Sequence, residues 1–351
     1  MECFWERLAR EKRPVWLYGT GNGADKILDC AERFGIPIRG VFASDGFVRN
    51  RVFRGFPVKR YADALVADGE NITVLLAFGT NRPEVMDFIR TLDGRHDLIL
   101  PEVPLYGGDL FDGTYADRHA ADLTAARALF SDRRSGKLFD DAVRFRLTGK
   151  LDCLADAEPF SVTCASLLGG KAFRTAVDGG AFRGDTTEVI AETLRPEKIY
   201  AAEPDPRSFD KLCSYAKSET RTEVVPVRAV LGDADGESVF SASGSRGAGT
   251  DGKNRRSSET AVRAVRLDTL LQNEPADFIK LDVEGSEEQA LRGGNQVILR
   301  DGPSLAVSLY HRTDDLWKIP LAVHGLLPDH RLYLRRVPCF PMWDLTLWAV
   351  S

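Results

Sequence analysis

Short apolar runs alternate with helix-like stretches over the first hundred residues. The run at 15–18 leads into the glycine-rich turn Gly19-Thr20-Gly21-Asn22-Gly23, and a helix-like pattern from Ala24 to Phe34 follows. Later apolar runs are separated by helical stretches such as Pro83 to Leu92. These runs lie at 38–43, 72–78 and 98–100. The alternation predicts a small parallel sheet, so we expect residues 1–108 to form a Rossmann-like α/β domain.

The strand pattern stops after this domain. Between Asp109 and Phe160 charged residues are frequent. The apolar residues there recur at helical spacing, and they are Leu123, Ala126, Leu129 and Phe130. This spacing predicts helices rather than strands. We interpret residues 109–170 as a helical connector.

A second set of strands begins with another glycine-rich turn. The strand and turn at 176–186 lead into a helix-like pattern that continues to Leu194. Further apolar runs lie at 198–202, 223–230, 278–283 and 305–310. Two β-like runs at 331–337 and 345–350, separated by prolines, predict an antiparallel hairpin at the sheet edge. We expect residues 171–351 to form a doubly wound Rossmann-like sheet.

One stretch interrupts this second pattern. Residues 241–260 are rich in glycine, serine and charge, and they lack apolar periodicity. Such a composition predicts a mobile loop or lid.

Composition narrows the class of protein. The 351 residues are 43% hydrophobic and 28% charged, as in an ordinary globular protein. A net charge of −5 without a dense Lys/Arg stripe argues against nucleic-acid binding. We find no membrane span, no secretory signal, and no zinc or disulfide spacing among the six cysteines. A cytoplasmic protein with a small or weakly charged ligand is expected.

The second glycine turn is a candidate cofactor site, and it reads Asp178-Gly179-Gly180-Ala181-Phe182-Arg183-Gly184-Asp185-Thr186. Glycines let a ligand approach the backbone, and the amides at the start of the following helix attract a negative group. A tight strand-to-helix connection would need the same glycines.

An acidic residue ends the next predicted strand. Glu203, within Glu203-Pro204-Asp205, follows Asp178 by 25 positions, close to the spacing at which a carboxylate binds the ribose of a nucleoside cofactor. Glu203 is therefore a candidate ribose ligand. Capping of the following helix is the alternative role.

Charged and apolar residues alternate at 278–285. A period of two would place Lys280, Asp282 and Glu284 on one face at the carboxyl end of a strand, where open α/β sheets bind ligands. All three are candidate catalytic residues, which could position an acceptor hydroxyl or act as a base. Asp282 and Glu284 are also candidate ligands for a divalent cation such as Mg²⁺. A structural cluster of lysine and carboxylates would give the same pattern.

His311 follows the next predicted strand and is the only one of the five histidines beside a predicted sheet terminus. Its ordinary pKa near 6.5 suits the removal of a proton from a hydroxyl at neutral pH. His311 is therefore a candidate catalytic base, with a structural role as the alternative.

These elements, in this order, resemble the FkbM family of S-adenosylmethionine-dependent methyltransferases. The likeness spans roughly Phe173 to Ser351. The stretches that carry it are Val177-Asp178-Gly179-Gly180-Ala181, Ala202-Glu203-Pro204-Asp205-Pro206 and Ile279-Lys280-Leu281-Asp282-Val283-Glu284-Gly285-Ser286-Glu287. The chain looks like a subgroup in which an extra Rossmann-like domain precedes the catalytic one.

The resemblance implies a class I methyltransferase fold and O-methylation of a sugar, glycan or secondary metabolite. S-adenosylmethionine would be the cofactor, with its methionine end in the glycine turn, its ribose on Glu203 and its adenine near Val230. The acceptor would be a small molecule or glycan. The oligomeric state, a homo-oligomer included, stays open.

The first glycine turn keeps two other interpretations open. Together with Asp45, it could bind a nicotinamide cofactor in an oxidoreductase, or a nucleotide-sugar in a non-catalytic sensor. The third glycine of a full dinucleotide fingerprint is displaced to Gly23 or replaced by Ala24. A vestigial or dimerising role for this domain is a further alternative.

Overall fold

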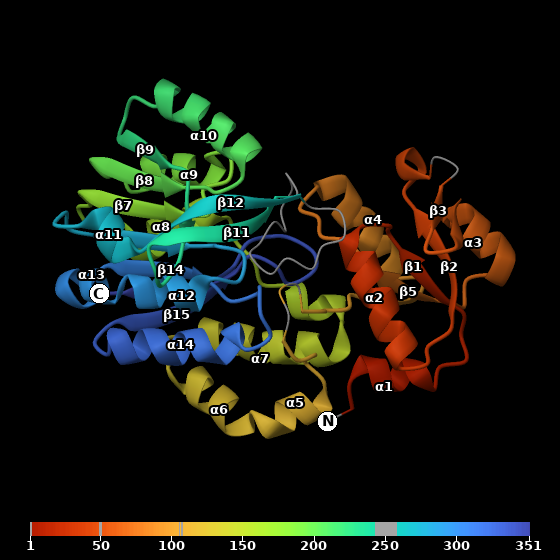
Figure 1. The fold of residues 1–351 in the computed structure, drawn as a ribbon. Coiled ribbons are helices and arrows are strands. Elements are labelled where there is room, and N and C mark those ends of the chain that lie inside the picture. Colours follow the sequence, from red (N-terminus) through yellow and green to blue (C-terminus); the bar gives the residue numbers. More distant parts are fainter. Residues whose placement is uncertain (1, 49–50, 105, 107, 243–257) are drawn as a thin grey trace.

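Two lobes lie side by side, each built around a sheet (Figure 1). The structure is a computed structural model that describes residues 2–48, 51–104, 106, 108–242 and 258–351 of the 351-residue chain. The first three connector helices, within residues 113–148, run along the lower side of the C-terminal lobe in this view.

The N-terminal sheet has the strand order β3-β4-β2-β1-β5-β6 and is parallel except for the edge strand β3. Its strands are β1 (Val15–Tyr18), β2 (Ile38–Ala43), β3 (Val52–Phe53), β4 (Phe56–Arg60), β5 (Thr73–Leu76) and β6 (Asp97–Ile99). Its helices are α1 (Phe4–Ala9), α2 (Asn22–Arg33), η1 (Asp45–Phe47), α3 (Tyr61–Asp68) and α4 (Pro83–Asp93). The predicted parallel sheet is confirmed, whereas β3, β4 and α3 were not predicted.

The segment after this sheet is helical, as predicted. Its elements are α5 (Gly113–Arg118), α6 (Ala120–Ala128), α7 (Arg133–Thr148), η2 (Leu151–Leu154) and α8 (Phe160–Leu168). Helices α6, α7 and α8 pack against elements of the C-terminal lobe, which are α14, β15 and α9. At the free edge of β15, the Ser131 amide donates to the Leu332 carbonyl at 2.8 Å. The connector thus covers an edge that would otherwise be open to another strand.

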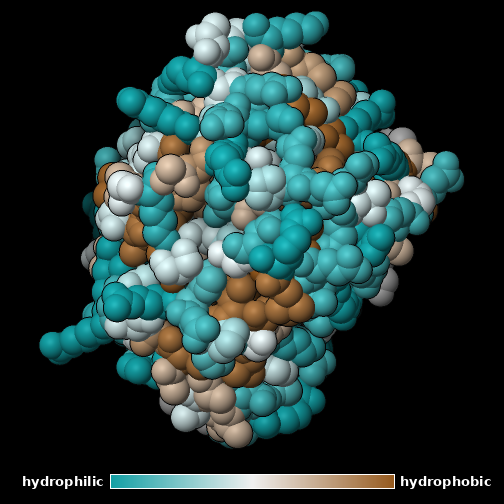
Figure 2. All heavy atoms as spheres, turned by 90° about the vertical axis from the view of Figure 1, so that its left-hand side faces the viewer, coloured by the Kyte–Doolittle hydropathy of each residue, from teal (hydrophilic) through white to brown (hydrophobic). Residues whose placement is uncertain are grey.

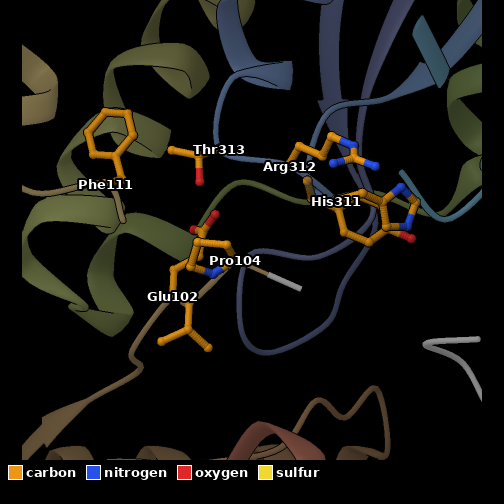
Figure 3. A pocket seen from close by; sticks show the side chains of 8 residues that line it. Glu102, Pro104, Phe111, His311, Arg312 and Thr313 are labelled. Atoms are coloured by element: carbon orange, nitrogen blue, oxygen red, sulfur yellow. The ribbon is translucent and has the colours of Figure 1, made fainter. Parts of the chain in front are cut away.

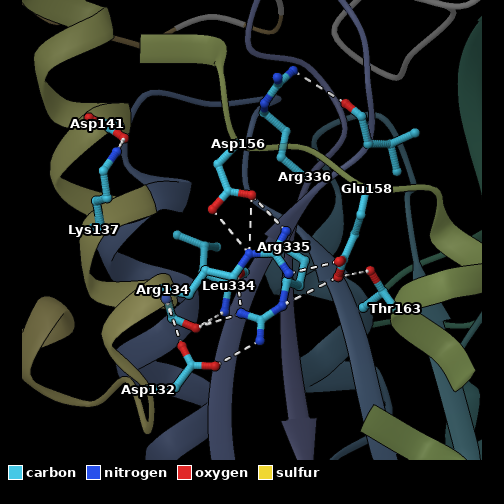
Figure 4. A network of polar contacts seen from close by, with 12 residues as sticks. Asp132, Arg134, Lys137, Asp141, Asp156, Glu158, Thr163, Leu334, Arg335 and Arg336 are labelled. Carbon is cyan, nitrogen blue, oxygen red and sulfur yellow. Dashed lines mark hydrogen bonds and ion pairs between the residues drawn. The ribbon is translucent and has the colours of Figure 1, made fainter. Parts of the chain in front are cut away.

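A polar network fastens α7 to this edge strand (Figure 4). The Arg335 guanidinium lies 2.7 Å from an oxygen of Asp132. The Arg134 guanidinium contacts Asp156 at 2.6 Å and Glu158 at 2.7 Å. Because these bonds are charge-assisted and several are bidentate or shared, they fix the orientation of α7 as well as its position.

The C-terminal sheet has the order β15-β16-β14-β13-β7-β8-β9, and only β16 runs against the others. Its strands are β7 (Thr175–Gly179), β8 (Lys198–Ala202), β9 (Glu223–Val227), β13 (Phe278–Leu281), β14 (Ser304–Ser308), β15 (Arg331–Arg336) and β16 (Leu345–Val350). Its helices are α9 (Asp185–Thr193), α10 (Pro206–Ser218), α11 (Leu267–Leu271), α12 (Glu287–Gly293), α13 (Asn295–Asp301) and α14 (Asp315–Leu326). The predicted doubly wound sheet with its antiparallel hairpin is confirmed.

A small second sheet corrects two expectations. It has the order β10-β12-β11, formed by β10 (Val230–Leu231), β11 (Gly236–Ala242) and β12 (Ser258–Val265). The predicted strand at 223–230 is therefore two strands, with a break before Val230. The ends of the predicted loop at 241–260 are paired strands, because β11 and β12 form an antiparallel ladder. Its middle, 243–257, lies outside the described residues.

Adjacent side chains along the central strands pack on opposite faces of the sheet. Phe278 joins a core cluster with Ile190 and Trp348, whereas the adjacent Ile279 packs into the main core with Val297. This is the pattern of a strand buried on both faces. The central strands are therefore fixed from both sides, and their carboxyl ends form a rigid platform.

The outer end of the C-terminal lobe is mostly hydrophilic, with hydrophobic residues gathered in a few patches (Figure 2). Among the helices of the described residues, none has the length and apolar character needed to cross a membrane.

Candidate active site

The second glycine turn lies where the strand order of the C-terminal sheet reverses, between β7 and β13. Gly180 has a φ of +76°, and a Cβ there would lie 1.8 Å from the Asp282 carbonyl oxygen. Only glycine fits that position. The amides of Gly180 and Ala181 both donate to the Ala202 carbonyl at 3.0 Å. The turn is therefore held tightly against the strands on both sides. This close packing is enough to require glycine at position 180, with or without a ligand.

The Glu203 carboxylate faces this turn from the end of β8. Its Oε2 accepts a hydrogen bond from the Phe182 amide at 2.9 Å, and its Oε1 accepts one from the Asp205 amide at 2.7 Å. Burial raises the pKa of Glu203 to about 7, although both amides oppose the shift. Asp205 itself caps α10 by accepting from the amides of Arg207 and Ser208. The capping role considered for Glu203 thus belongs to Asp205.

The remaining predicted cofactor residues border the same turn. Asp185 is exposed and Thr186 is half-buried at the start of α9. Pro204 and Val230 are half-buried at the ends of neighbouring elements. The residue after Val230, Leu231, lies 2.8 Å from where a Cβ on Gly179 would stand. The fold thus brings the predicted set to one sheet edge.

Asp178 and Lys280 form a buried ion pair behind the turn. Asp178 Oδ1 lies 3.0 Å from Lys280 Nζ, and Asp178 Oδ2 accepts from the Thr187 hydroxyl at 2.7 Å. Lys280 also donates to two carbonyl oxygens of the turn, at 3.3 and 3.0 Å. Burial opposes its charge, but the charges of Asp178 and then Asp282 outweigh burial and raise the Lys280 pKa. Asp178 is fully buried, so the contact of the pair with its surroundings runs through the turn carbonyls that Lys280 holds.

Asp282 follows directly after β13, which ends at Leu281. The predicted strand at 278–283 was two residues too long. Asp282 Oδ1 accepts hydrogen bonds from the hydroxyls of Ser308, at 2.8 Å, and Tyr310, at 2.9 Å. These donors come from β14 and the loop after it, so the carboxylate joins two neighbouring strand ends.

The backbone conformation that places Glu284 in the site differs from the predicted strand alternation. It lies in the turn after β13 with a φ of +54°, a backbone conformation that residues other than glycine rarely adopt. Its carboxylate accepts a hydrogen bond from the hydroxyl of Tyr106, a residue of the segment between the lobes. The turn, and not a strand period of two, therefore places Glu284 beside Asp282.

His311 lies between these carboxylates and is 1% exposed. Its Nδ1 is 2.8 Å from Glu287 Oε1, and its Nε2 is 3.6 Å from Asp282 Oδ1 and 3.5 Å from Glu284 Oε2. Within the described residues, Nε2 makes no hydrogen bond. Burial would lower the His311 pKa, but Glu287 and then the other two carboxylates raise it to about 10. At neutral pH His311 is therefore a hydrogen-bond donor with a positive charge.

Glu287 is also a member of this cluster, although no sequence pattern predicted it as a site residue. It begins α12, and its Oε1 accepts from the Val283 amide at 2.8 Å as well as facing His311. Asp282, Glu287 and His311 each place a potential ligand atom within 4.8 Å of the others. These three residues are not the predicted cation ligands, which were Asp282 and Glu284. The Glu287–His311 hydrogen bond explains the short spacing without an ion, so the geometry adds no support for Mg²⁺.

Comparison with known protein families identifies this part of the chain. The sequence of residues 178–337 matches the methyltransferase FkbM domain. The chain carries an FkbM methyltransferase domain. It is therefore an enzyme that transfers a methyl group, and the family resemblance of its motifs is confirmed.

One solved structure extends the similarity of the fold beyond the FkbM domain. A methyltransferase FkbM from Methylobacillus flagellatus KT matches with a TM-score of 0.69 and 19% identity, covering 99% of this chain and 92% of that one. An rRNA methylase from Streptococcus thermophilus matches with a TM-score of 0.34 and 12% identity, covering 54% of this chain and 93% of that one. Among curated proteins, none matches the chain. The first similarity shows that the two-lobed fold is shared along nearly the whole chain.

A small cavity borders the FkbM domain on the side of the connector. Its lining comes from two segments, which are 102–104 with Phe111 and 310–313. Figure 3 shows Glu102 and Pro104 opposite Arg312 and Thr313, with His311 beside them. The segment that leaves the N-terminal lobe therefore forms one wall next to the His311 cluster.

The loop after β5, which packs beside the first glycine turn, lies against the loop between β15 and β16. A Cβ on Gly19 would lie 2.7 Å from the Phe78 ring, and a Cβ on Gly79 would lie 2.0 Å from the Trp343 ring. Thr80 and Phe340 exchange backbone hydrogen bonds of 2.7 and 2.8 Å. The loop between β15 and β16 thus docks beside the place where an N-terminal nucleotide was considered. The comparisons favour methyl transfer over the oxidoreductase interpretation.

Proposed function

We propose that this methyltransferase uses S-adenosylmethionine to methylate a hydroxyl group of a sugar-like small molecule or glycan. The observation that carries the proposal is the convergence of the glycine turn, the Glu203 carboxylate and the His311 cluster at one sheet edge. S-adenosylmethionine supplies a methyl group that its sulfonium already activates. The residues of the chain then have to bind this donor, orient the acceptor and take up its proton.

The donor side suits a nucleoside that carries an amino acid. Each Glu203 oxygen already accepts one backbone amide, and a carboxylate oxygen has a second lone pair. Glu203 can therefore accept the two ribose hydroxyls without giving up its hold on the turn. The start of α9 offers backbone amides to the methionine carboxylate. Phe182, Asp185 and Thr186 would border the methionine end, and Val230 the adenine.

The acceptor side is the space between Asp282, Glu284 and His311. A buried N–H without a partner is costly, and a ligand oxygen at His311 Nε2 would satisfy it. Burial would raise the Asp282 pKa, but the charges of Lys280 and then His311 lower it, so Asp282 is ionised at neutral pH. The carboxylate pair accepts the hydrogen bond of the hydroxyl and takes its proton as the methyl group moves. His311 balances the charge of the pair and directs the oxygen.

A neutral polyol fits this chemistry. The site offers carboxylate acceptors, a cationic donor and the rings of Tyr106 and Tyr310, which lie beside His311 at centroid distances of 5.7 and 4.1 Å. Hydroxyl groups both donate and accept, so a sugar can use all of these groups at once. An acidic acceptor would meet repulsion from Asp282 and Glu284.

Two measurements test the proposal in sequence. Calorimetry should show S-adenosylmethionine and S-adenosylhomocysteine binding to the full chain at one site. Mass spectrometry should then show one added methyl group on members of a panel of methyl hexosides and oligosaccharides. Absence of binding would reject the cofactor, whereas binding with transfer only to non-hydroxyl acceptors would reject the acceptor class. The variant His311→Gln should retain binding and lose most of the transfer.

A further inference from the structure

Tyr106 brings the segment between the lobes into direct contact with the acceptor site. Its side chain is 6% exposed, and its hydroxyl donates to the Glu284 carboxylate. Its ring meets the His311 ring edge-on, with centroids 5.7 Å apart and planes at 74°. Burial, followed by the negative charge of Glu284, raises the Tyr106 pKa, so the hydroxyl keeps its proton and remains a donor.

The backbone of Tyr106 itself is held against the same turn that carries Glu284. Arg312 Nη1 donates to the Tyr106 carbonyl and Arg312 Nε donates to the Gly285 carbonyl, both at 2.7 Å. Gly285 has a φ of +91°, and a Cβ there would lie 3.1 Å from Tyr106 Cβ. The close backbone approach thus depends on glycine. Tyr106 and the turn at 282–285 are held together by contacts on both sides.

Each of the two carboxylates beside His311 is tied to a tyrosine. Tyr310 donates to Asp282 at 2.9 Å, and Tyr106 donates to Glu284. With these ties in place, His311 Nε2 lies 3.6 and 3.5 Å from the two carboxylates and bonds to neither. A Glu284 carboxylate without its tyrosine would be drawn to the His311 cation, because opposite charges attract strongly where water is scarce. It would then take the place of the acceptor oxygen.

We propose that Tyr106 is a positioning residue of the acceptor site, which restrains the Glu284 carboxylate so that His311 Nε2 stays available to the acceptor hydroxyl. The proposal rests on the proposed function, and it makes the segment leaving the N-terminal lobe part of the active site. Tyr106 acts through Glu284 and His311 and takes no proton itself.

A matched tyrosine elsewhere in the chain provides the control. Tyr61 and His96, in the N-terminal lobe, have ring centroids 5.8 Å apart and planes at 72°, nearly the geometry of Tyr106 and His311. The Tyr61 hydroxyl bonds to His96 Nε2. Tyr106→Phe and Tyr61→Phe therefore each remove one hydroxyl beside one histidine and keep the ring.

The first experiment is ¹⁵N NMR of the full chain labelled at histidine, with His311 and His96 assigned through His311→Gln and His96→Gln. Tyr106→Phe should shift the His311 Nε2 signal as Glu284 moves onto it, and should leave the His96 signals in place. Tyr61→Phe should do the reverse. An unchanged His311 signal in Tyr106→Phe would overturn the proposal, whatever the function of the enzyme.

The second experiment separates binding of the two substrates, with methyl hexosides as acceptor probes. Tyr106→Phe should raise the acceptor KM about tenfold or more, because the site is blocked by a charged group. The Kd of S-adenosylmethionine should stay within about twofold. An unchanged acceptor KM would contradict the positioning role. If the wild-type chain binds no S-adenosylmethionine, the proposed function fails, and the NMR result alone decides whether Tyr106 restrains Glu284 beside His311.

Discussion

The two glycine turns of this chain have the same local structure and very different surroundings. In each lobe a buried strand, β1 or β7, leads through glycines into a helix at the place where the strand order reverses. The first turn lies among aromatic rings, with Tyr18 stacked on Phe42 at 4.8 Å and Phe78 against Gly19. The second lies on the Asp178–Lys280 ion pair.

This difference shows what a glycine turn does and does not indicate. Positive φ or close packing explains Gly19 and Gly23 in the first turn and Gly180 and Gly184 in the second, so glycines in a turn can mark a tight connection alone. Buried charges are costly to retain, and perturbed ionisable groups gather at functional sites. The charges on the neighbouring strands, and not the glycines, therefore distinguish the catalytic lobe from the other.

The largest effect should follow from removing the charge behind the second turn. Lys280→Ala leaves Asp178 buried without its cation, so the free energy of unfolding should fall by about 3–5 kcal/mol. Lys26, beside the first turn, is only partly buried and donates to the Pro104 carbonyl at 3.0 Å. Lys26→Ala should cost about 1 kcal/mol. Urea denaturation of both variants measures the difference, and equal losses would mean that the two turns are supported alike.

The next effect concerns the cofactor. In Glu203→Gln, one of the two backbone amides would face an amide NH₂ instead of an oxygen, and the ribose would lose a charged acceptor. The Kd of S-adenosylmethionine should rise about 10- to 100-fold, as expected for hydrogen bonds to a charged group. Calorimetry measures the change, with circular dichroism as a check that the variant is folded. A Kd within twofold of the wild type would exclude Glu203 as a ribose ligand.

Much of the fold could be predicted because apolar runs mark strands that are buried on both faces. β1, β2 and β8 have the bounds expected from their runs. β3 has two residues, and β11 includes exposed polar positions, so neither gives such a run. The break between β9 and β10 was missed since Arg228 and Ala229 interrupt an otherwise β-like sequence by only two positions.

The site was predictable only where strand ends determine it. His311 and Glu203 follow strands, so their position at the sheet edge could be inferred from the order of elements. Glu284 depends on a turn with positive φ, which a period of two does not describe. Tyr106 contacts Glu284 across 178 positions of sequence, and no local pattern encodes a contact of that range.

A smaller effect follows from the Glu203 pKa of about 7, which lies above the ordinary value of 4.5 because the carboxyl is buried. Ionising Glu203 therefore costs folding free energy as the pH rises from 4.5 through 7. Ribose binding needs the ionised form, so the affinity for S-adenosylmethionine should increase about tenfold between pH 6 and pH 8. Calorimetry at both pH values measures this. The increase should be absent in Glu203→Gln, and an equal increase in that variant would assign the titration to another group.

The smallest effect is expected at the acidic residue that corresponds to Glu203 in the other lobe. Asp45 follows β2 as Glu203 follows β8, but its side chain is exposed, whereas Glu203 is 6% exposed. Exposed substitutions without special contacts change stability by less than about 0.5 kcal/mol. Asp45→Asn should therefore leave the free energy of unfolding, the Kd of S-adenosylmethionine and the methylation rate unchanged. If the wild type binds NADH or a nucleotide-sugar and this variant binds it more weakly, the first turn holds a second nucleotide. The contrast between the two lobes would then lie in which nucleotide each one binds.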